Sequence, residues 1–251
     1  MSSNIDSRAV ALDRITWTGP LLLATGRSGM ILLAQAVAAG VFALRGHPSP
    51  WRAAAPWWTV YGTLVDLGCL ALMWRFTRAE GISMRDLIGA IKLPRDILTG
   101  LSYYCLVLPL FVGGGMLSTK LLYGSLQAGG SSGLFMARTL PLWAVVYSLS
   151  AWWMIWSPTE EMTYQAYALP RIQALSGRTW VAMAVVGFWW ALQHSLLPFL
   201  PDWRSVLWRF LAFVPGVTVF MLIYLKTRRL APLIVAHWLM DIGAVLMTLR
   251  L

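Results

Sequence analysis

The chain has 251 residues, of which 58% are hydrophobic and only 12% are charged, and its mean hydropathy is +0.64. Soluble domains carry roughly 25% charged residues, so the composition excludes an ordinary soluble protein and favours a single polytopic membrane domain over residues 1–251. The formal net charge of +10 does not indicate nucleic-acid binding, because the basic residues cluster between apolar runs, where they set topology and contact lipid headgroups.

The first half of the chain predicts three membrane-spanning helices, at about residues 20–44, 54–74 and 97–122. The first two contain ionisable residues, Arg27 and Asp66. Between the second and third, apolar residues recur at helical spacing beside charges over residues 82–92, which predicts a short amphipathic helix on the surface. The glycine run at residues 113–115 predicts a kink or a close helix contact.

In the second half, the apolar run at residues 140–156 predicts a fourth span. Ser157 and Pro158 are expected to interrupt it, with a further helical stretch continuing to about residue 175. Three more spans are expected at about residues 179–197, 205–225 and 232–249. The predicted fold is therefore all-α, a polytopic bundle of about seven transmembrane helices plus the amphipathic helix.

Lysine and arginine are more frequent in the loops on the side of the amino terminus than in those on the other side. The positive-inside rule therefore predicts a cytoplasmic amino terminus. We expect an integral membrane protein of the bacterial inner (plasma) membrane. Its expected partners are membrane lipids and a peptide or protein substrate at the membrane.

Two adjacent carboxylates, Glu160 and Glu161, lie between apolar runs. Carboxylates inside a membrane segment are costly, and an adjacent pair more so because like charges repel. On a helix, Glu161 and Gln165 share a face while Glu160 points about 100° away, so one carboxylate can face a cavity while neighbours hold the other. The alternative is that Ser157 and Pro158 mark the membrane edge and both acids are solvated.

Two further polar sites follow on separate apolar segments. His194, considered alone, is more readily explained as a core or interfacial histidine. His237 and Asp241 are four residues apart and share a helical face, where a carboxylate can fix the imidazole tautomer; a hydrogen bond with only a structural role is the alternative. Counted from loops assigned to one side, the three sites lie at comparable depths, so we expect them to form one site between helices.

The combined pattern resembles the CPBP family of intramembrane proteases. This group of CAAX proteases and bacteriocin-processing proteins, also called Abi proteins, includes the type II CAAX prenyl endopeptidases. The resemblance covers about residues 150–245, the expected catalytic core. The motif positions are Glu160 and Glu161, then Trp190 and His194 as aromatic-x-x-x-His, then His237 and Asp241.

The resemblance implies an intramembrane endopeptidase. Glu160 and His194 would activate a water, His237 and Asp241 would stabilise the oxyanion or complete the cavity, and Glu161 would support them. The residue types leave the metal question open. Glu160, His194 and His237 could hold a divalent metal such as zinc with one open position, and they could equally serve a metal-free water.

The chain departs from the family pattern at two polar positions: Gln165 stands where the family usually has arginine, and Asp241 where it often has asparagine. A neutral glutamine cannot hold an ionised Glu161 by charge. Glu161 is then protonated, or another donor replaces the arginine, or the activity is reduced. The alternative function is a non-catalytic family member with an immunity or partner-binding role. A haem protein or proton relay is less favoured, because it leaves the paired glutamates unexplained.

Overall fold

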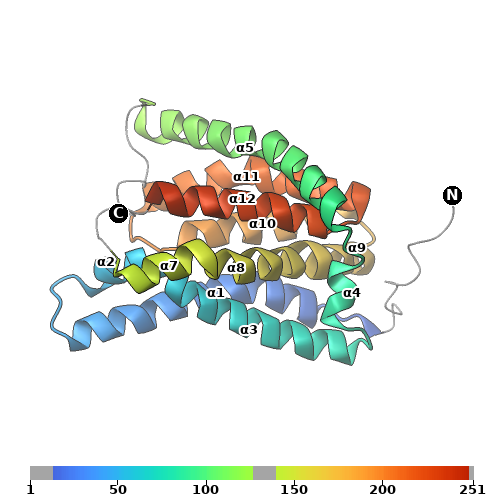
Figure 1. The fold of residues 1–251 in the computed structure, drawn as a ribbon, viewed down its shortest axis with the longest axis horizontal. Helices are drawn as coiled ribbons and strands as arrows, with labels where there is room; N and C mark the ends of the chain where they lie inside the picture. Colours follow the sequence, from blue (N-terminus) through green and yellow to red (C-terminus); the bar gives the residue numbers. More distant parts are fainter. Residues whose placement is uncertain (1–13, 127–139, 249–251) are drawn as a thin grey trace.

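The computed structural model describes residues 14–126 and 140–248, and every regular element in these ranges is a helix. Consecutive rods run in alternating directions along a bundle, with α7, α8, η4 and α9 forming one rod (Figure 1). The elements are α1 (Thr18–Leu44), α2 (Pro50–Ala54), η3 (Ala55–Trp57), α3 (Trp58–Ala79), α4 (Met84–Ile88), α5 (Leu93–Tyr123), α7 (Leu142–Ser150), α8 (Trp152–Glu161), the π-helix η4 (Met162–Ala168), α9 (Leu169–Ser176), α10 (Thr179–Leu196), α11 (Trp203–Thr227) and α12 (Ala231–Thr248).

This architecture confirms the predicted all-α membrane bundle. Among the described residues, α1, α5 and α11 are long and apolar enough to cross a membrane, and α12 contains a shorter apolar stretch, Ala231–Leu246. The predicted number of seven spans stays a prediction. Large apolar side chains on the outside of α1 and α5, such as Leu33, Leu98 and Leu121, are more than half exposed, which suits contact with lipid.

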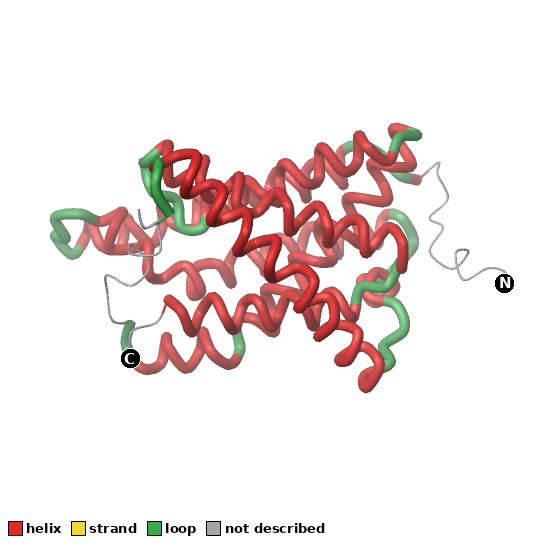
Figure 2. Tube along the Cα trace, turned by 90° about the horizontal axis from the view of Figure 1, so that it is seen from above, coloured by secondary structure: helices red, strands yellow, loops and turns green. Residues whose placement is uncertain are grey.

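The rod formed by α7, α8, η4 and α9 lies in the middle of the bundle. In Figure 1, α8 lies between α12 on one side and α1 and α3 on the other. Contacts of α8 with α3 and α12, and of η4 with α1, α9 and α10, place this rod against helices from both halves of the chain. The view from above in Figure 2 shows the connecting loops gathered at the two ends of the bundle. Side chains at the end of α8 therefore point into the interior.

Two expected helix boundaries are wrong. Pro158 does not interrupt the helix, because it lies inside α8, and the break falls instead at Ala151 between α7 and α8. A proline inside a helix removes one backbone hydrogen bond and crowds the preceding turn. Here the neighbouring residues Ser157 and Thr159 are buried, and their packing keeps the helix continuous through Pro158. The amphipathic helix is also shorter than expected, because Gly89, at φ +72°, ends α4 after five residues.

Glycines allow α5 to approach its neighbours closely. A Cβ at Gly114 would lie 2.6 Å from the backbone oxygen of Ala212 on α11, and one at Gly100 would lie 2.7 Å from the backbone oxygen of Pro232 on α12. Neither partner atom can move without moving its helix. The predicted close helix contact at residues 113–115 is thus confirmed at Gly114, whereas a Cβ at Gly113 would meet nothing within 4 Å.

Candidate active site

Glu160 and Glu161 are the last two residues of α8, and both are completely buried. The alternative of solvated acids at the membrane edge is therefore wrong. Two buried carboxylates require partners, because a buried charge without compensation is strongly unfavourable. The two side chains find different sets of partners, as expected for adjacent positions that point about 100° apart on a helix.

Three ring nitrogens surround one oxygen of Glu160. The indole Nε1 of Trp190 donates a hydrogen bond to Glu160 Oε1. His194 Nε2 lies 3.6 Å and His237 Nε2 3.9 Å from the same oxygen. Trp190 and His194 come from α10 and His237 from α12, so three rods meet at this atom. Both histidine distances are longer than a hydrogen bond.

The hydrogen bond of His194 to the backbone determines its tautomer. His194 Nδ1 lies 2.8 Å from the carbonyl oxygen of Trp190, which can only accept, so Nδ1 carries a proton. In the neutral ring, Nε2 is then an acceptor facing Glu160. The ring stacks on Phe213 with centroids 3.8 Å apart, which holds its plane. The His194 side chain is 17% exposed, whereas that of Glu160 is fully buried.

Glu161 contacts α12 and its own helical rod. The amide of Gln165 donates to Glu161 Oε2, and His237 Nδ1 lies 2.9 Å from Glu161 Oε1. Asp241, expected to fix the His237 tautomer, is 3.6 Å from His237 Nε2, beyond a hydrogen bond. The carboxylate within hydrogen-bond distance of the His237 ring is therefore Glu161, which contacts the other ring nitrogen. Asp241 in turn accepts a hydrogen bond from Ser157.

Sequence reasoning missed the polar neighbours on the opposite side of Glu160. Arg27, on α1, lies 3.6 Å from Glu160 Oε2 through Nη2. The same Nη2 donates to Asp66 on α3 at 2.9 Å, and Nε donates to Gln193 on α10 at 2.8 Å. The only signal in the sequence was the presence of Arg27 and Asp66 as ionisable residues within apolar runs.

The side chains predicted as metal candidates lie close together, with His194 Nε2 3.6 Å and His237 Nε2 3.9 Å from Glu160 Oε1. Among residues 14–126 and 140–248, no group of three or more histidine, cysteine, aspartate or glutamate side chains is arranged to hold a metal ion. Trp190 donates to the Glu160 oxygen that faces both histidines, which places a hydrogen-bond donor where a metal would compete.

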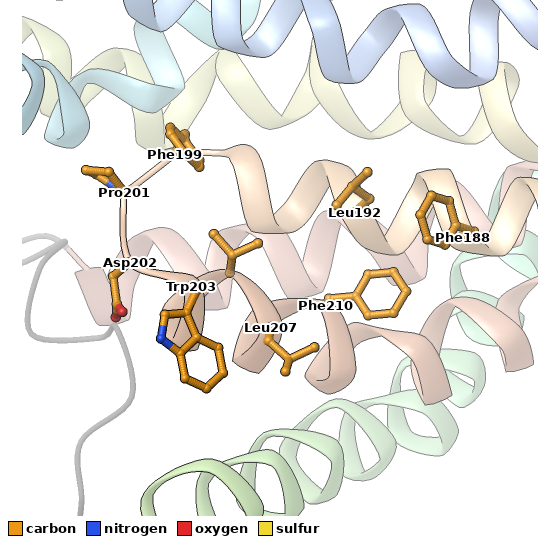
Figure 3. A pocket seen from close by; sticks show the side chains of 9 residues that line it. Phe188, Leu192, Phe199, Pro201, Asp202, Trp203, Leu207 and Phe210 are labelled. Atoms are coloured by element: carbon orange, nitrogen blue, oxygen red, sulfur yellow. The ribbon is translucent and has the colours of Figure 1, made fainter.

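A separate apolar cavity of about 640 Å³ lies between α10, α11 and the loop that joins them (Figure 3). Its lining is mainly aromatic and aliphatic, including Phe188, Leu192, Trp203 and Phe210. None of the predicted site residues lines it, so the polar site and this cavity are distinct features of the described chain.

Comparison with known proteins gives one family match. Residues 137–243 match the family described as "Type II CAAX prenyl endopeptidase Rce1-like". The matched range includes Glu160, Glu161, His194, His237 and Asp241, and the match confirms the resemblance that the motifs indicated. Searches of curated proteins and of solved structures found no match.

Proposed function

From the Rce1-like CAAX endopeptidase region at residues 137–243, we propose that this membrane protein is an intramembrane endopeptidase that hydrolyses peptide bonds of membrane-associated substrates. The observation that carries the proposal is the meeting of Trp190, His194 and His237 at one oxygen of the buried Glu160. A carboxylate and an imidazole acceptor side by side suit the activation of a water.

In the proposed reaction, Glu160 takes a proton from a water that lies beside His194 Nε2. The resulting hydroxide adds to the carbonyl carbon of the substrate, and the carbonyl oxygen becomes an oxyanion. The proton held by Glu160 then passes to the leaving amine as the carbon–nitrogen bond breaks, so that an acid and an amine are released and the carboxylate is restored. Hydrogen bonds to the developing oxyanion supply much of the rate enhancement in acyl transfer.

His237 is the proposed donor to that oxyanion. Its Nδ1 is directed at Glu161, and its Nε2 faces the space between Glu160 and Asp241. A ring that carries a proton on Nε2 can donate a hydrogen bond from that atom to the oxyanion. Glu161 and Asp241 would then orient and charge-balance His237 without contacting the substrate.

The test is cleavage of a panel of membrane-anchored peptides, with and without a prenyl group, by protein in lipid vesicles. Loss of a general base typically costs about 10²–10⁴-fold, and we expect Glu160→Gln and His194→Ala each to lower kcat/KM within this range. Asp202→Asn is the matched control, because it removes a carboxylate at the N-cap of α11, outside the site, and asparagine is also a favoured N-cap residue. Equal cleavage by wild type and both variants would refute the site assignment.

One observation favours a second candidate, a non-catalytic member with an immunity or partner-binding role. Gln165 stands where the family usually has arginine, and its neutral amide is the donor to Glu161. If the biological function of the protein survives Glu160→Gln while no peptide is cleaved, the non-catalytic role replaces the peptidase.

A further inference from the structure

We propose that Arg27, held by Asp66, is a positioning residue that fixes the carboxylate of Glu160 in the orientation needed at the site. The inference rests on the proposed function for its catalytic consequence. Arg27 and Asp66 belong to α1 and α3, outside the region that matches the family. The first half of the chain would thus complete the site and not only anchor it in the membrane.

Arg27 is a fully buried arginine in the interior of a mostly apolar bundle, and Asp66 is fully buried as well. Burying a guanidinium is unfavourable unless charges and hydrogen bonds compensate it. The chain places this arginine against Asp66 and Glu160, the two carboxylates that its Nη2 reaches at 2.9 and 3.6 Å. A residue with such a cost in a membrane segment is a functional candidate.

The two oxygens of Glu160 face different surroundings. Oε1 accepts from Trp190 and faces both histidines, whereas Oε2 faces Arg27. A carboxylate that is free to rotate would exchange the two oxygens. A cation on one side and the indole donor on the other select a single orientation, in which Oε1 points at the space where the water is proposed to lie.

Arg27 itself is held in place by several contacts. Its Nε donates to Gln193 Oε1, which also accepts from the Tyr164 hydroxyl at 3.2 Å. Its guanidinium carbon lies 4.2 Å from the ring centroid of Trp156, a cation–π contact. Gln193 precedes His194 on α10, so the arginine also joins α1 to the helix that carries the histidine. A planar, fixed guanidinium suits positioning better than a flexible ammonium.

The activity arm compares Arg27→Lys, Arg27→Met and the double variant Arg27→Met/Asp66→Asn, with Arg75→Met as the control at an exposed position of α3. Misplacement of a catalytic group by about 1 Å can cost about 10²-fold, and we expect Arg27→Met to lower kcat by this order with little change in KM. Arg27→Lys keeps the charge without the planar fork and should be intermediate. Arg75→Met should match wild type.

The double variant separates positioning from folding. Removing both charges of the pair leaves no lone buried carboxylate at position 66, so the melting temperature should recover toward wild type while kcat stays low. A purely structural role for Arg27 would instead restore kcat together with the melting temperature. Recovery of kcat in the double variant, or a loss in Arg27→Met confined to KM, would overturn the proposal.

A second arm does not depend on catalysis. We expect the effects of Arg27→Met and Glu160→Gln on thermal stability to be non-additive. The variant that carries both changes, Arg27→Met/Glu160→Gln, should be more stable than the sum of the two single losses predicts. Additive effects would show that Arg27 and Glu160 do not interact, and this result would overturn the proposal. If the cycle shows coupling but wild type cleaves no peptide, the positioning inference stands and the proposed function fails.

Discussion

Glu160 and Glu161 are adjacent in sequence but have different partners. Glu160 meets the indole of Trp190 and approaches both histidines, whereas Glu161 contacts Gln165 and the Nδ1 of His237. The helix separates them, since adjacent side chains point about 100° apart. We infer a division of roles, in which Glu160 contacts the water and Glu161 orients His237.

Glu161→Gln tests this division. The substitution keeps the size of the side chain but removes the negative charge beside His237. Loss of a second partner that orients a histidine typically costs about 10–100-fold at metal sites, and we expect a similar fall in kcat here, smaller than the fall for Glu160→Gln. Steady-state cleavage rates of the two variants in the same vesicles provide the comparison. If Glu161→Gln is the more damaging change, the two roles are reversed.

Among the elements, the π-helix η4 follows the two glutamates directly and is tied to α3 and α9 by a buried charge cluster. Arg171 Nε lies 3.0 Å from both carboxylate oxygens of Glu80, and its guanidinium carbon lies 3.8 Å from the ring centroid of Tyr167. The Tyr167 hydroxyl donates to Glu80 at 2.7 Å. This cluster holds the rod that presents Glu160 against the helix that carries Asp66.

Breaking one half of the Glu80–Arg171 pair should destabilise the fold. Both residues are buried, and removing one partner of a buried pair leaves an uncompensated charge at a cost of about 3–5 kcal/mol. We expect Glu80→Gln to lose stability on this order, and Glu80→Gln/Arg171→Met to regain part of it. Unfolding in mixed micelles measures both. If Glu80→Gln is as stable as the wild type, the Glu80–Arg171 pair makes no net contribution to the free energy of unfolding.

The packing of α5 on α11 provides a matched pair of substitutions at adjacent glycines. Overpacking typically costs about 1–3 kcal/mol, and Gly114→Ala should lose stability in this range because its Cβ would meet the backbone of Ala212. Gly113→Ala has open space and should be neutral or stabilising by up to about 1 kcal/mol through helix propensity. The same unfolding assay compares them, and equal effects would contradict the close contact.

In the molecule as a whole, both halves of the chain contribute to one polar interior. The matched region supplies Glu160, His194 and His237, and the helices before it supply Arg27 and Asp66. Each of these groups is buried or nearly so within a bundle whose outer surface is largely apolar. Ionisable residues within membrane segments are expected to face the interior of a bundle in this way.

The alternating course of the rods predicts the topology. In Figure 1, α1 begins and α12 ends at opposite ends of the bundle. If each rod crosses the membrane, the two ends of the chain lie on opposite sides, with the amino terminus cytoplasmic by the positive-inside rule. Compartment-specific reporter fusions at each end of the full chain measure this. Signals from the same compartment would contradict seven crossings.

The helical membrane class and most helix positions follow from the amino-acid sequence alone. Apolar runs and local spacing act within a few residues, so they indicate where helices form without knowledge of the partners. The face shared by Glu161 and Gln165 is likewise a local property of the helix, and the motif spacing was enough for the family resemblance. The catalytic roles of Glu160, His194 and His237 stay predictions.

The partners of each polar group depend on the packing of the rods. Arg27 reaches a carboxylate more than a hundred residues away, Ser157 rather than His237 holds Asp241, and Trp190 donates to Glu160. No spacing along the chain encodes these contacts, because they arise when separate helices meet at a particular depth and rotation. Once buried there, each charge takes whichever partner lies within reach, since an uncompensated charge in an apolar interior is too costly.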